Sequence, residues 1–330
     1  MLDPASVTPP AALRNRHVQS VLASSRLRRI ATRSRATALL DGAQEQILDA
    51  GQGVRLQGFL TRAAAPSRGL AVLLHGWEGS ARSNYILATG ARLLEAGFDV
   101  FRLHLRDHGD THALNRGLFH SCRIDEVVGA VGNLAQRVPH RALFLAGFSL
   151  GGNFALRVAL RAPQAGITLR HVAAVCPVIS PRAGLEAIEA APWFYQRYFM
   201  HKWGRSLRRK QALYPESYAF SPEELRAGVR GLTRALVERY TEFDSVDDYL
   251  DGYSIAGERL AALRVPASIL AAADDPIIPI EDFRHLTLPP DARLEITPWG
   301  GHCGFITDLR LRGLAEDWIT EQIDRACPAD

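Results

Sequence analysis

Lysine and long apolar runs are scarce in this sequence of 330 residues. Lys202 and Lys210 are its only lysines, so nearly every cation is an arginine, which we attribute to genome composition. No apolar run reaches the roughly 20 residues that span a bilayer. The first ten residues lack the basic and apolar regions of a secretory signal. A net charge of +4 is too small to indicate nucleic-acid binding.

Cysteines are also few and widely spaced, at Cys122, Cys176, Cys303 and Cys327. They form no Cys-x-x-Cys pair, which argues against a zinc knuckle or a disulfide framework and is typical of a reducing compartment. The sequence offers no metal-ligand cluster and no glycine-rich phosphate loop. We therefore expect a cytoplasmic protein without a metal or an organic cofactor.

Short apolar runs alternate with longer amphipathic segments over much of the chain. Residues 44–50 and 54–61 alternate apolar and polar side chains, which predicts a starting hairpin. The later continuous apolar runs predict strands buried on both faces of a parallel sheet. The expected strands are 70–75, 98–105, 142–146, 172–176, 267–272 and 293–297, and the expected helices are 83–96, 124–137, 151–161, 281–286 and 305–323. This order predicts an α/β fold with a mostly parallel, twisted sheet and helices on both faces.

The alternation stops between residues 178 and 263, after the sixth strand. This segment is typical of a helical insertion, and such insertions at the carboxyl ends of strands form lids. We therefore expect a basic N-terminal segment packed on the core (1–40), an α/β core (41–177 and 264–330) and a helical lid (178–263). The aromatic residues of the insertion either line a pocket or only pack it onto the sheet: Trp193, Phe194, Tyr195, Tyr198, Phe199, Trp203, Tyr214, Tyr218 and Phe220.

The segment 14–35 carries seven arginines and no acidic residue. Apolar side chains between them, such as Val21 and Ile30, predict an amphipathic helix. One interpretation is peripheral contact with an anionic membrane at its inner face, to which each surface cation adds about 1 kcal/mol. The other is a solvated arm packed on the core. Both interpretations stay open.

The strongest motif is Gly147-Phe148-Ser149-Leu150-Gly151. It lies between an expected strand and an expected helix, which is the context of a nucleophile elbow. The serine of such an elbow occupies a strained turn, so its neighbours must be small for the backbones to approach. We therefore predict that Ser149 is a nucleophile exposed at the top of the sheet.

A serine hydroxyl needs a base, and the base needs an orienting acid. In chain order the acid follows the nucleophile and the histidine comes last. His302 lies on a glycine-rich loop after the final strand and is the expected base. The preceding strand ends at two neighbouring carboxylates, Asp274 and Asp275, which are both candidates for the acid.

An oxyanion hole needs two backbone donors. The amide of Leu150, directly after the nucleophile, is the expected first donor. The loop after strand 70–75 supplies the second, which we place at Trp77, with the indole as a wall of the pocket. His75 in the same loop is expected to make structural hydrogen bonds.

With these residues in place, the chain resembles the α/β-hydrolase superfamily over about residues 40–325, and within it the YheT-type esterases. The resemblance implies that Ser149, Asp275 and His302 form a catalytic triad. Family members usually read Asp-x-x-(Val/Ile)-Pro at the acid, which aligns with Asp275 and leaves Asp274 as a loop-capping residue. The resemblance also implies that the basic N-terminal segment belongs to the fold. The motifs that carry it are 16–20 (RHVQS), 75–84 (HGWEGSARSN), 147–153 (GFSLGGN), 240–244 (YTEFD) with 246–249 (VDDY), and 300–305 (GGHCGF).

Two stretches depart from that pattern or leave it ambiguous. Residues 106–111 (RDHGDT) stand where many relatives have Arg-Gly-x-x-Gly, so this loop either reshapes the pocket edge or ties itself together. His120 and Asp125 fit an H-x-x-x-x-D pattern that is tied to acyl transfer in some relatives. A helix cap at Ser121 explains the same stretch equally well.

The expected activity is hydrolysis of carboxylic esters through an acyl-enzyme, with short- to medium-chain acyl groups or lipids as substrates. An acyltransferase or a thioesterase would use the same triad. A catalytically inactive binding protein on this fold is the third possibility, since fold alone does not determine function. The oligomeric state does not follow from the sequence.

Overall fold

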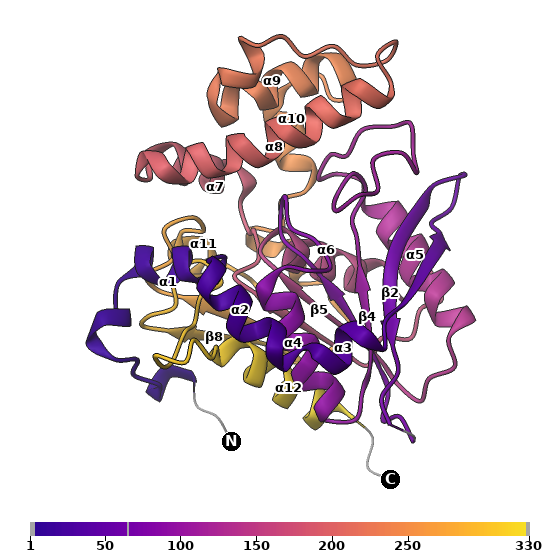
Figure 1. Cartoon of the computed structure of the whole chain (residues 1–330), viewed down its shortest axis with the longest axis vertical. Helices are drawn as coiled ribbons and strands as arrows, with labels where there is room; N and C mark the ends of the chain where they lie inside the picture. Colours follow the sequence, from indigo (N-terminus) through magenta and orange to yellow (C-terminus); the bar gives the residue numbers. More distant parts are fainter. Residues whose placement is uncertain (1–3, 65, 328–330) are drawn as a thin grey trace.

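The computed structural model describes residues 4–64 and 66–327. In this part of the chain, eight strands form one sheet in the order β1-β2-β4-β3-β5-β6-β7-β8 (Figure 1). The first hairpin is antiparallel and β2 pairs antiparallel with β4, whereas all later pairs are parallel. The predicted α/β class is confirmed. The strands are β1 Gln44–Asp49, β2 Arg55–Thr61, β3 Leu70–Leu74, β4 Asp99–Leu103, β5 Leu143–Phe148, β6 His171–Val175, β7 Ala267–Ala272 and β8 Ala292–Thr297.

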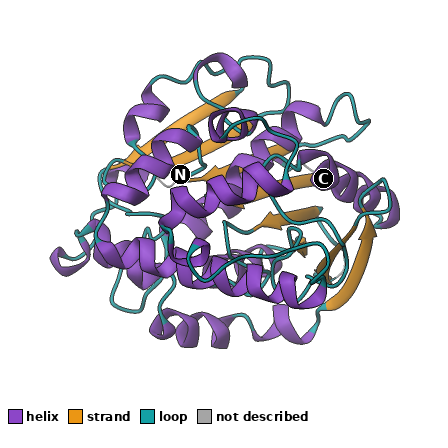
Figure 2. Ribbon diagram, turned by 90° about the horizontal axis from the view of Figure 1, so that it is seen from above, coloured by secondary structure: helices purple, strands orange, loops and turns teal. Residues whose placement is uncertain are grey.

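Helices cover both faces of this sheet (Figures 1 and 2). One apolar layer lies between the sheet and α4 and α12, with α2 packed on the outside of α4. The other lies between the sheet and α5 and α6. Every residue of β3 to β7 is buried, as expected for strands covered on both faces. The core helices are α4 Asn84–Glu95, α5 Ile124–Arg137, α6 Leu150–Arg161, α11 Ile280–Arg284 and α12 Leu314–Ala326.

Four helices lie between β6 and β7, above the carboxyl ends of the strands (Figure 1). Their buried side chains form one continuous core with the α5 and α6 layer. We call this segment, residues 178–263, the helical insertion. Its helices are α7 Pro181–Ala190, α8 Trp193–Leu213, α9 Gly228–Tyr240 and α10 Val246–Gly252.

The N-terminal segment packs as three short helices, α1 Arg16–Ala23, α2 Arg26–Arg35 and α3 Thr37–Asp41. The prediction of a single amphipathic helix over 14–35 is wrong. The chain turns at residues 24–25, where the Ser25 side chain accepts a hydrogen bond from the amide of Arg28 and so caps a new helix.

The closing helix is also shorter than predicted, since it begins at Leu314 and not at Phe305. Phe305 has a φ of +45°, which a helix does not accommodate. The chain instead forms a loop that is closed by a bridge between Ile306 and Gly313. Among the described residues, no helix is long and apolar enough to cross a membrane.

Candidate active site

Ser149 lies on a sharp turn between β5 and α6, with a φ of +54°. A side chain at Gly147 would overlap the carbonyl of Gly151, and one at Gly151 would overlap the carbonyl of Leu74. Both glycines are therefore required by the close approach of two backbone segments. The turn holds the serine in a conformation that non-glycine residues rarely adopt, and such strain is concentrated at functional sites.

The structure brings Ser149, His302 and Asp275 together. In the sequence Ser149 lies 153 residues before His302, and Asp275 lies 27 residues before it. His302 Nε2 lies 2.9 Å from Ser149 Oγ, and its Nδ1 lies 2.9 Å from Asp275 Oδ2. The other oxygen of Asp275 accepts hydrogen bonds from the amides of Ile277 and Ile278. These bonds fix the carboxylate, which in turn orients the imidazole.

Asp274, the neighbouring carboxylate, points elsewhere. Its Oδ1 accepts a hydrogen bond of 2.9 Å from the amide of Gly301. Asp274 therefore caps the loop that carries His302, while Asp275 contacts the ring itself. Asp274 thus supports the backbone of the residue before His302, and Asp275 supports the imidazole itself.

Helix α1 also holds the loop of His302, in a way that the sequence did not reveal. Ser20 Oγ accepts a hydrogen bond of 2.8 Å from the amide of His302. Gln19 bonds both the amide and the carbonyl of Ile306, and it is buried. The RHVQS motif marked this stretch as typical of the family. Ile306 and His302, which Gln19 and Ser20 contact, lie more than 280 positions later in the sequence, so the motif did not indicate these contacts. Gln19 and Ser20 are therefore positioning residues for His302.

Leu150 directly follows Ser149 at the start of α6, and Trp77 lies in the loop after β3; both residues line the same cavity as Ser149. Within the described residues, neither amide donates to an acceptor of the protein. A hydrogen bond to His108 stabilises the loop of Trp77: the amide of Glu78 donates to His108 Nε2 at 3.1 Å. Burial lowers the pKa of His108 to about 3, so that the ring stays neutral and can accept. His75 donates to the Gly76 carbonyl and accepts from the amide of Leu105.

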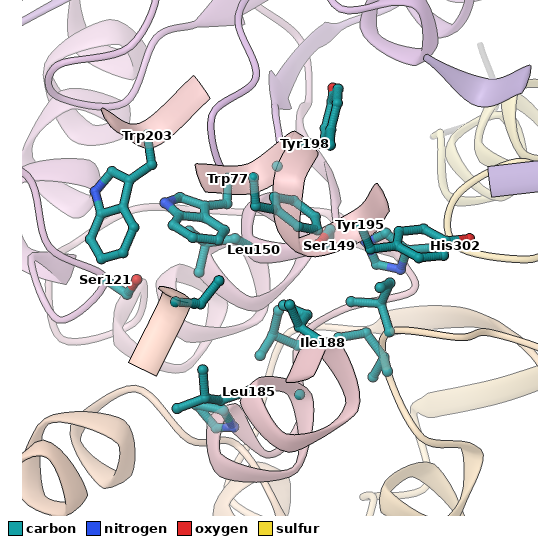
Figure 3. Close-up of a pocket in the computed structure, with 18 of the residues that line it drawn as sticks. Trp77, Ser121, Ser149, Leu150, Leu185, Ile188, Tyr195, Tyr198, Trp203 and His302 are labelled. Carbon is teal, nitrogen blue, oxygen red and sulfur yellow. Dashed lines mark hydrogen bonds between the residues drawn. The ribbon is translucent and has the colours of Figure 1, made fainter. Parts of the chain in front are cut away.

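A cavity of about 400 Å³ opens above Ser149 and lies between the sheet and the helical insertion (Figure 3). Ser149 and His302 lie toward one end of the view, and Trp203 and Ser121 toward the other. Its size is typical of small-molecule sites. Among the described residues that line it there is no Asp, Glu, Lys or Arg. The cavity can therefore accept an apolar group beside Ser149, but its described lining offers no carboxylate to pair with a buried cation.

The aromatic residues of the insertion divide between the two roles considered above. Of the nine named from the sequence, five line the cavity, and Phe199 stacks on the indole of Trp77 with 5.2 Å between the ring centroids. Tyr218 and Phe220 instead pack around Tyr240. The five lining residues are Phe194, Tyr195, Tyr198, Phe199 and Trp203.

Residues 106–111 tie their loop together and anchor the insertion. The ammonium of Lys210 on α8 is fully buried and donates to Asp107 Oδ1 at 2.8 Å. It also donates to the carbonyls of His112 and Asn115. The second oxygen of Asp107 accepts from the amide of Phe119. This buried ion pair is therefore one of the links between core and insertion.

The H-x-x-x-x-D pattern does not form a pair. His120 is buried and lines the cavity, whereas the side chain of Asp125 is 92% exposed. The alternative of a cap at Ser121 is wrong, because α5 begins after Arg123 without a side-chain cap. The amide of Ser121 instead donates to the hydroxyl of Tyr249, which holds this corner against the insertion.

Two cysteines lie beside His302: Cys303 follows it in the chain, and Cys176 approaches from β6, which its position in the sequence could not indicate. The sulfurs of Cys176 and Cys303 and a ring nitrogen of His302 all lie within 4.8 Å of one another. Burial lowers the pKa of His302. The Asp275 carboxylate and the Cys303 sulfur raise it by more than burial lowers it, so the pKa lies well above its ordinary value. The net effect favours an imidazolium stabilised by its carboxylate.

The sheet order, the elbow and the cavity above it define this chain as an α/β hydrolase. Residues 65–303 match the Hydrolase_4 family, described as serine aminopeptidase, S33, and the chain belongs to that family. "Putative esterase YheT" of Escherichia coli (strain K12) is 26% identical over 276 residues, which cover 77% of each chain. The predicted resemblance to this branch is confirmed.

Two further similarities agree with this assignment. "Putative carbamate hydrolase RutD" of Caulobacter sp. (strain K31) is 25% identical over 256 residues, covering 69% of this chain and 87% of that one. A solved esterase structure from Pyrococcus furiosus superposes with a TM-score of 0.57 at 16% identity, over 87% of this chain and 91% of that one. Both relatives carry hydrolase names, and the solved structure shares the fold.

Proposed function

We propose that this hydrolase cleaves carboxylic esters through an acyl-enzyme formed on Ser149. The observation that carries the proposal is the hydrogen-bonded series from Ser149 through His302 to Asp275, with 2.9 Å at each step. A nucleophile, a base and an orienting acid in this order are the arrangement that activates a serine hydroxyl. The esterase name of the YheT relative supports the same chemistry.

In the proposed reaction Ser149 Oγ attacks the ester carbonyl while His302 Nε2 takes its proton. The amides of Trp77 and Leu150 stabilise the oxyanion that forms. His302 then returns the proton to the leaving alcohol, and Asp275 stabilises the imidazolium without accepting a proton. Water repeats the sequence on the acyl-enzyme and releases the acid.

The substrate class follows from the lining of the cavity. An aminopeptidase must hold a charged amino terminus, and an acidic side chain beside the nucleophile would serve that purpose. The described lining has no such group, and most of it is aliphatic or aromatic. We therefore infer a neutral ester with an apolar acyl group of short to medium length, bound beneath the helical insertion, which acts as its lid.

We also propose that the protein is cytoplasmic and that this lid approaches an anionic membrane at its inner face. Val21 of α1 and Tyr198 of α8 both line the cavity and are both exposed. Beyond them Leu27 and Ile30 of α2 are 66% and 63% exposed, and Trp193 of α8 is 73% exposed. Apolar side chains with nearby arginines are typical of interfacial helices. An ester of short or medium acyl length that partitions into the membrane would thus reach the cavity directly.

The proposal is tested with p-nitrophenyl esters graded by acyl length. We expect the highest kcat/KM for short or medium chains, and about a 10⁴-fold loss or more in Ser149→Ala. Ser34→Ala, which removes an exposed serine hydroxyl on α2, is the matched control and should be unchanged. Activity that persists in Ser149→Ala, or that rises steadily toward long-chain lipids, would contradict the proposal.

Three further measurements distinguish the alternative functions. Added alcohol or thiol that captures most of the acyl group would identify a transferase. An enzyme that prefers acyl thioesters over the matching oxygen esters would be a thioesterase. A native protein that is not labelled by a fluorophosphonate at Ser149 would be a binding protein.

A further inference from the structure

Cys176 and Cys303 form a thiol pair that touches the active site, although neither sulfur forms or breaks a bond in the proposed reaction. Cys176 directly follows β6, whose last residue, Val175, accepts the amide of Ser149 through its carbonyl. Cys303 directly follows His302. The pair therefore joins the turn of the nucleophile to the loop of the base.

The two segments lie side by side at this point. The Cys176 sulfur lies 3.9 Å from the carbonyl of Gly301, and the Cys303 sulfur lies 4.0 Å from the carbonyl of Val175. Each thiol thus faces the backbone that carries the other one. Both cysteines also have a positive φ, of +43° and +59°, which is uncommon for residues other than glycine.

Access to the pair comes from the cavity. Cys303 lines it together with Ser149 and His302, whereas Cys176 is fully buried behind Cys303. Burial raises the pKa of Cys303, but the hydrogen bond with Cys176 and the charge of His302 outweigh it and lower the pKa to about 6. A thiolate is the reactive form of cysteine, so the accessible member of the pair is the reactive one.

A resident metal ion suits this site less well than a dithiol does. A metal would need a free nitrogen of His302, and both ring nitrogens already lie 2.9 Å from Asp275 and Ser149. Two thiols near each other need only an oxidant. We propose that Cys303 and Cys176 are a redox switch, in which a peroxide converts them to a disulfide and inactivates the enzyme.

The reaction balances with one hydrogen peroxide for two thiols. The Cys303 thiolate attacks one peroxide oxygen, the O–O bond breaks, and the departing hydroxide takes up a proton as water. The sulfur of Cys176 then attacks the sulfenic sulfur of Cys303, and the S–O bond breaks to release the second water. The two sulfurs lose two electrons in total, and the peroxide gains them.

Inactivation follows from the packing around the loop. A disulfide requires the sulfurs to approach to about 2.05 Å, so Cys303 must move toward Cys176. The same loop packs closely on α1, because a side chain at Gly304 would overlap the carbonyl of Gln19, so its movement disturbs the contacts that hold His302. His302 is therefore displaced with its neighbour, and a misplacement of about 1 Å can cost about 100-fold in rate.

The test oxidises the purified full chain with hydrogen peroxide in the presence of EDTA, which excludes metal capture. We expect a disulfide-linked peptide that joins Cys176 to Cys303, a loss of the mass of two hydrogens, and recovery with dithiothreitol. Ester hydrolysis should fall at least tenfold and recover in parallel, a readout that rests on the proposed function. The linked peptide does not depend on that function, so the two claims can fail separately.

Single variants distinguish the roles within the pair. Cys176→Ala should stop at a sulfenic acid on Cys303 that reacts with dimedone, and Cys303→Ala should form no adduct and resist inactivation. Cys122→Ala and Cys327→Ala are the matched controls and should behave as the native chain. If Cys303→Ala does not fold, Cys176→Ala alone decides. Peroxide that oxidises only Cys122 or Cys327, or that inactivates without a Cys176–Cys303 link, would overturn the proposal.

Discussion

At the scale of single residues, the proposed chemistry depends on the protonation of His302. The ring must be neutral to take the proton of Ser149, and Asp275 and Cys303 raise its pKa well above the ordinary value despite burial. We therefore expect kcat/KM to fall as the pH drops through a pKa above about 6.5. A pH–rate profile of ester hydrolysis measures this limb.

The variant Asp275→Asn supplies the check on that prediction. It removes the charge that raises the pKa, so the acid limb should move to lower pH. The rate should also fall by about 10⁴-fold, because the imidazole loses its orientation. A native profile with its acid limb well below about 6.5, or an unchanged limb in the variant, would contradict the assigned role of Asp275.

The residues that the sequence predicted share a local signal. Ser149 lies in a five-residue motif between a strand and a helix, and Asp275 and His302 follow from chain order at the ends of the next strands. Ser20 and Cys176 carry no such signal, because each acts through a neighbour in space. Only the packing of α1 and β6 against the loop of His302 reveals their positions.

At the scale of elements, Lys210 anchors α8 over the active site. Its ammonium and Asp107 form a buried ion pair, and loss of one partner would leave an uncompensated buried charge. We expect Lys210→Met to destabilise the fold by about 3–5 kcal/mol. Denaturant unfolding monitored by tryptophan fluorescence measures the change.

The adjacent residue provides a control on the same helix. Arg209 pairs with Asp110, and both side chains are largely exposed. Arg209→Met should therefore cost no more than about 1 kcal/mol. Equal effects of the two substitutions would show that burial of the Lys210 pair is not what links the insertion to the core.

The bounds of continuously buried helices and strands were predicted to within a few residues. The bounds of helices that depend on a cap or a turn were not. The strand β7 and the helix α5 have the predicted bounds, because apolar periodicity alone defines them. The break between α1 and α2 depends on one serine side chain. The late start of α12 depends on positive φ values and a bridge to Gly313, which periodicity does not encode.

At the scale of the whole molecule, exposed charge and exposed apolar side chains occur together on the N-terminal helices. The helices α1 and α2 carry exposed apolar residues, such as Leu27 and Ile30, and the exposed arginines Arg16, Arg26, Arg29, Arg33 and Arg35. Arg28 is the exception, since it is buried in an ion pair with Glu316 on α12. The N-terminal segment therefore packs on the core through one side, and its other side is exposed to solvent.

We expect this face to bind vesicles that contain anionic lipid. The native chain should co-sediment with phosphatidylcholine vesicles that include phosphatidylserine, and binding should weaken as salt is raised. The double variant Leu27→Glu with Ile30→Glu should lose binding. Ile47→Glu, at a partly exposed apolar residue on β1, is the control. Equal binding by all three chains, or none by the native chain, would contradict the proposed membrane contact.

The central claim, that Ser149 becomes acylated, is tested most directly by trapping the acyl-enzyme. The protein is mixed with a p-nitrophenyl ester, quenched in acid within the first turnovers, and mapped by peptide mass spectrometry. The account predicts one acyl group per chain, on the peptide that contains Ser149, and none in Ser149→Ala. An acyl group on another residue, or turnover without any acylated peptide, would contradict it.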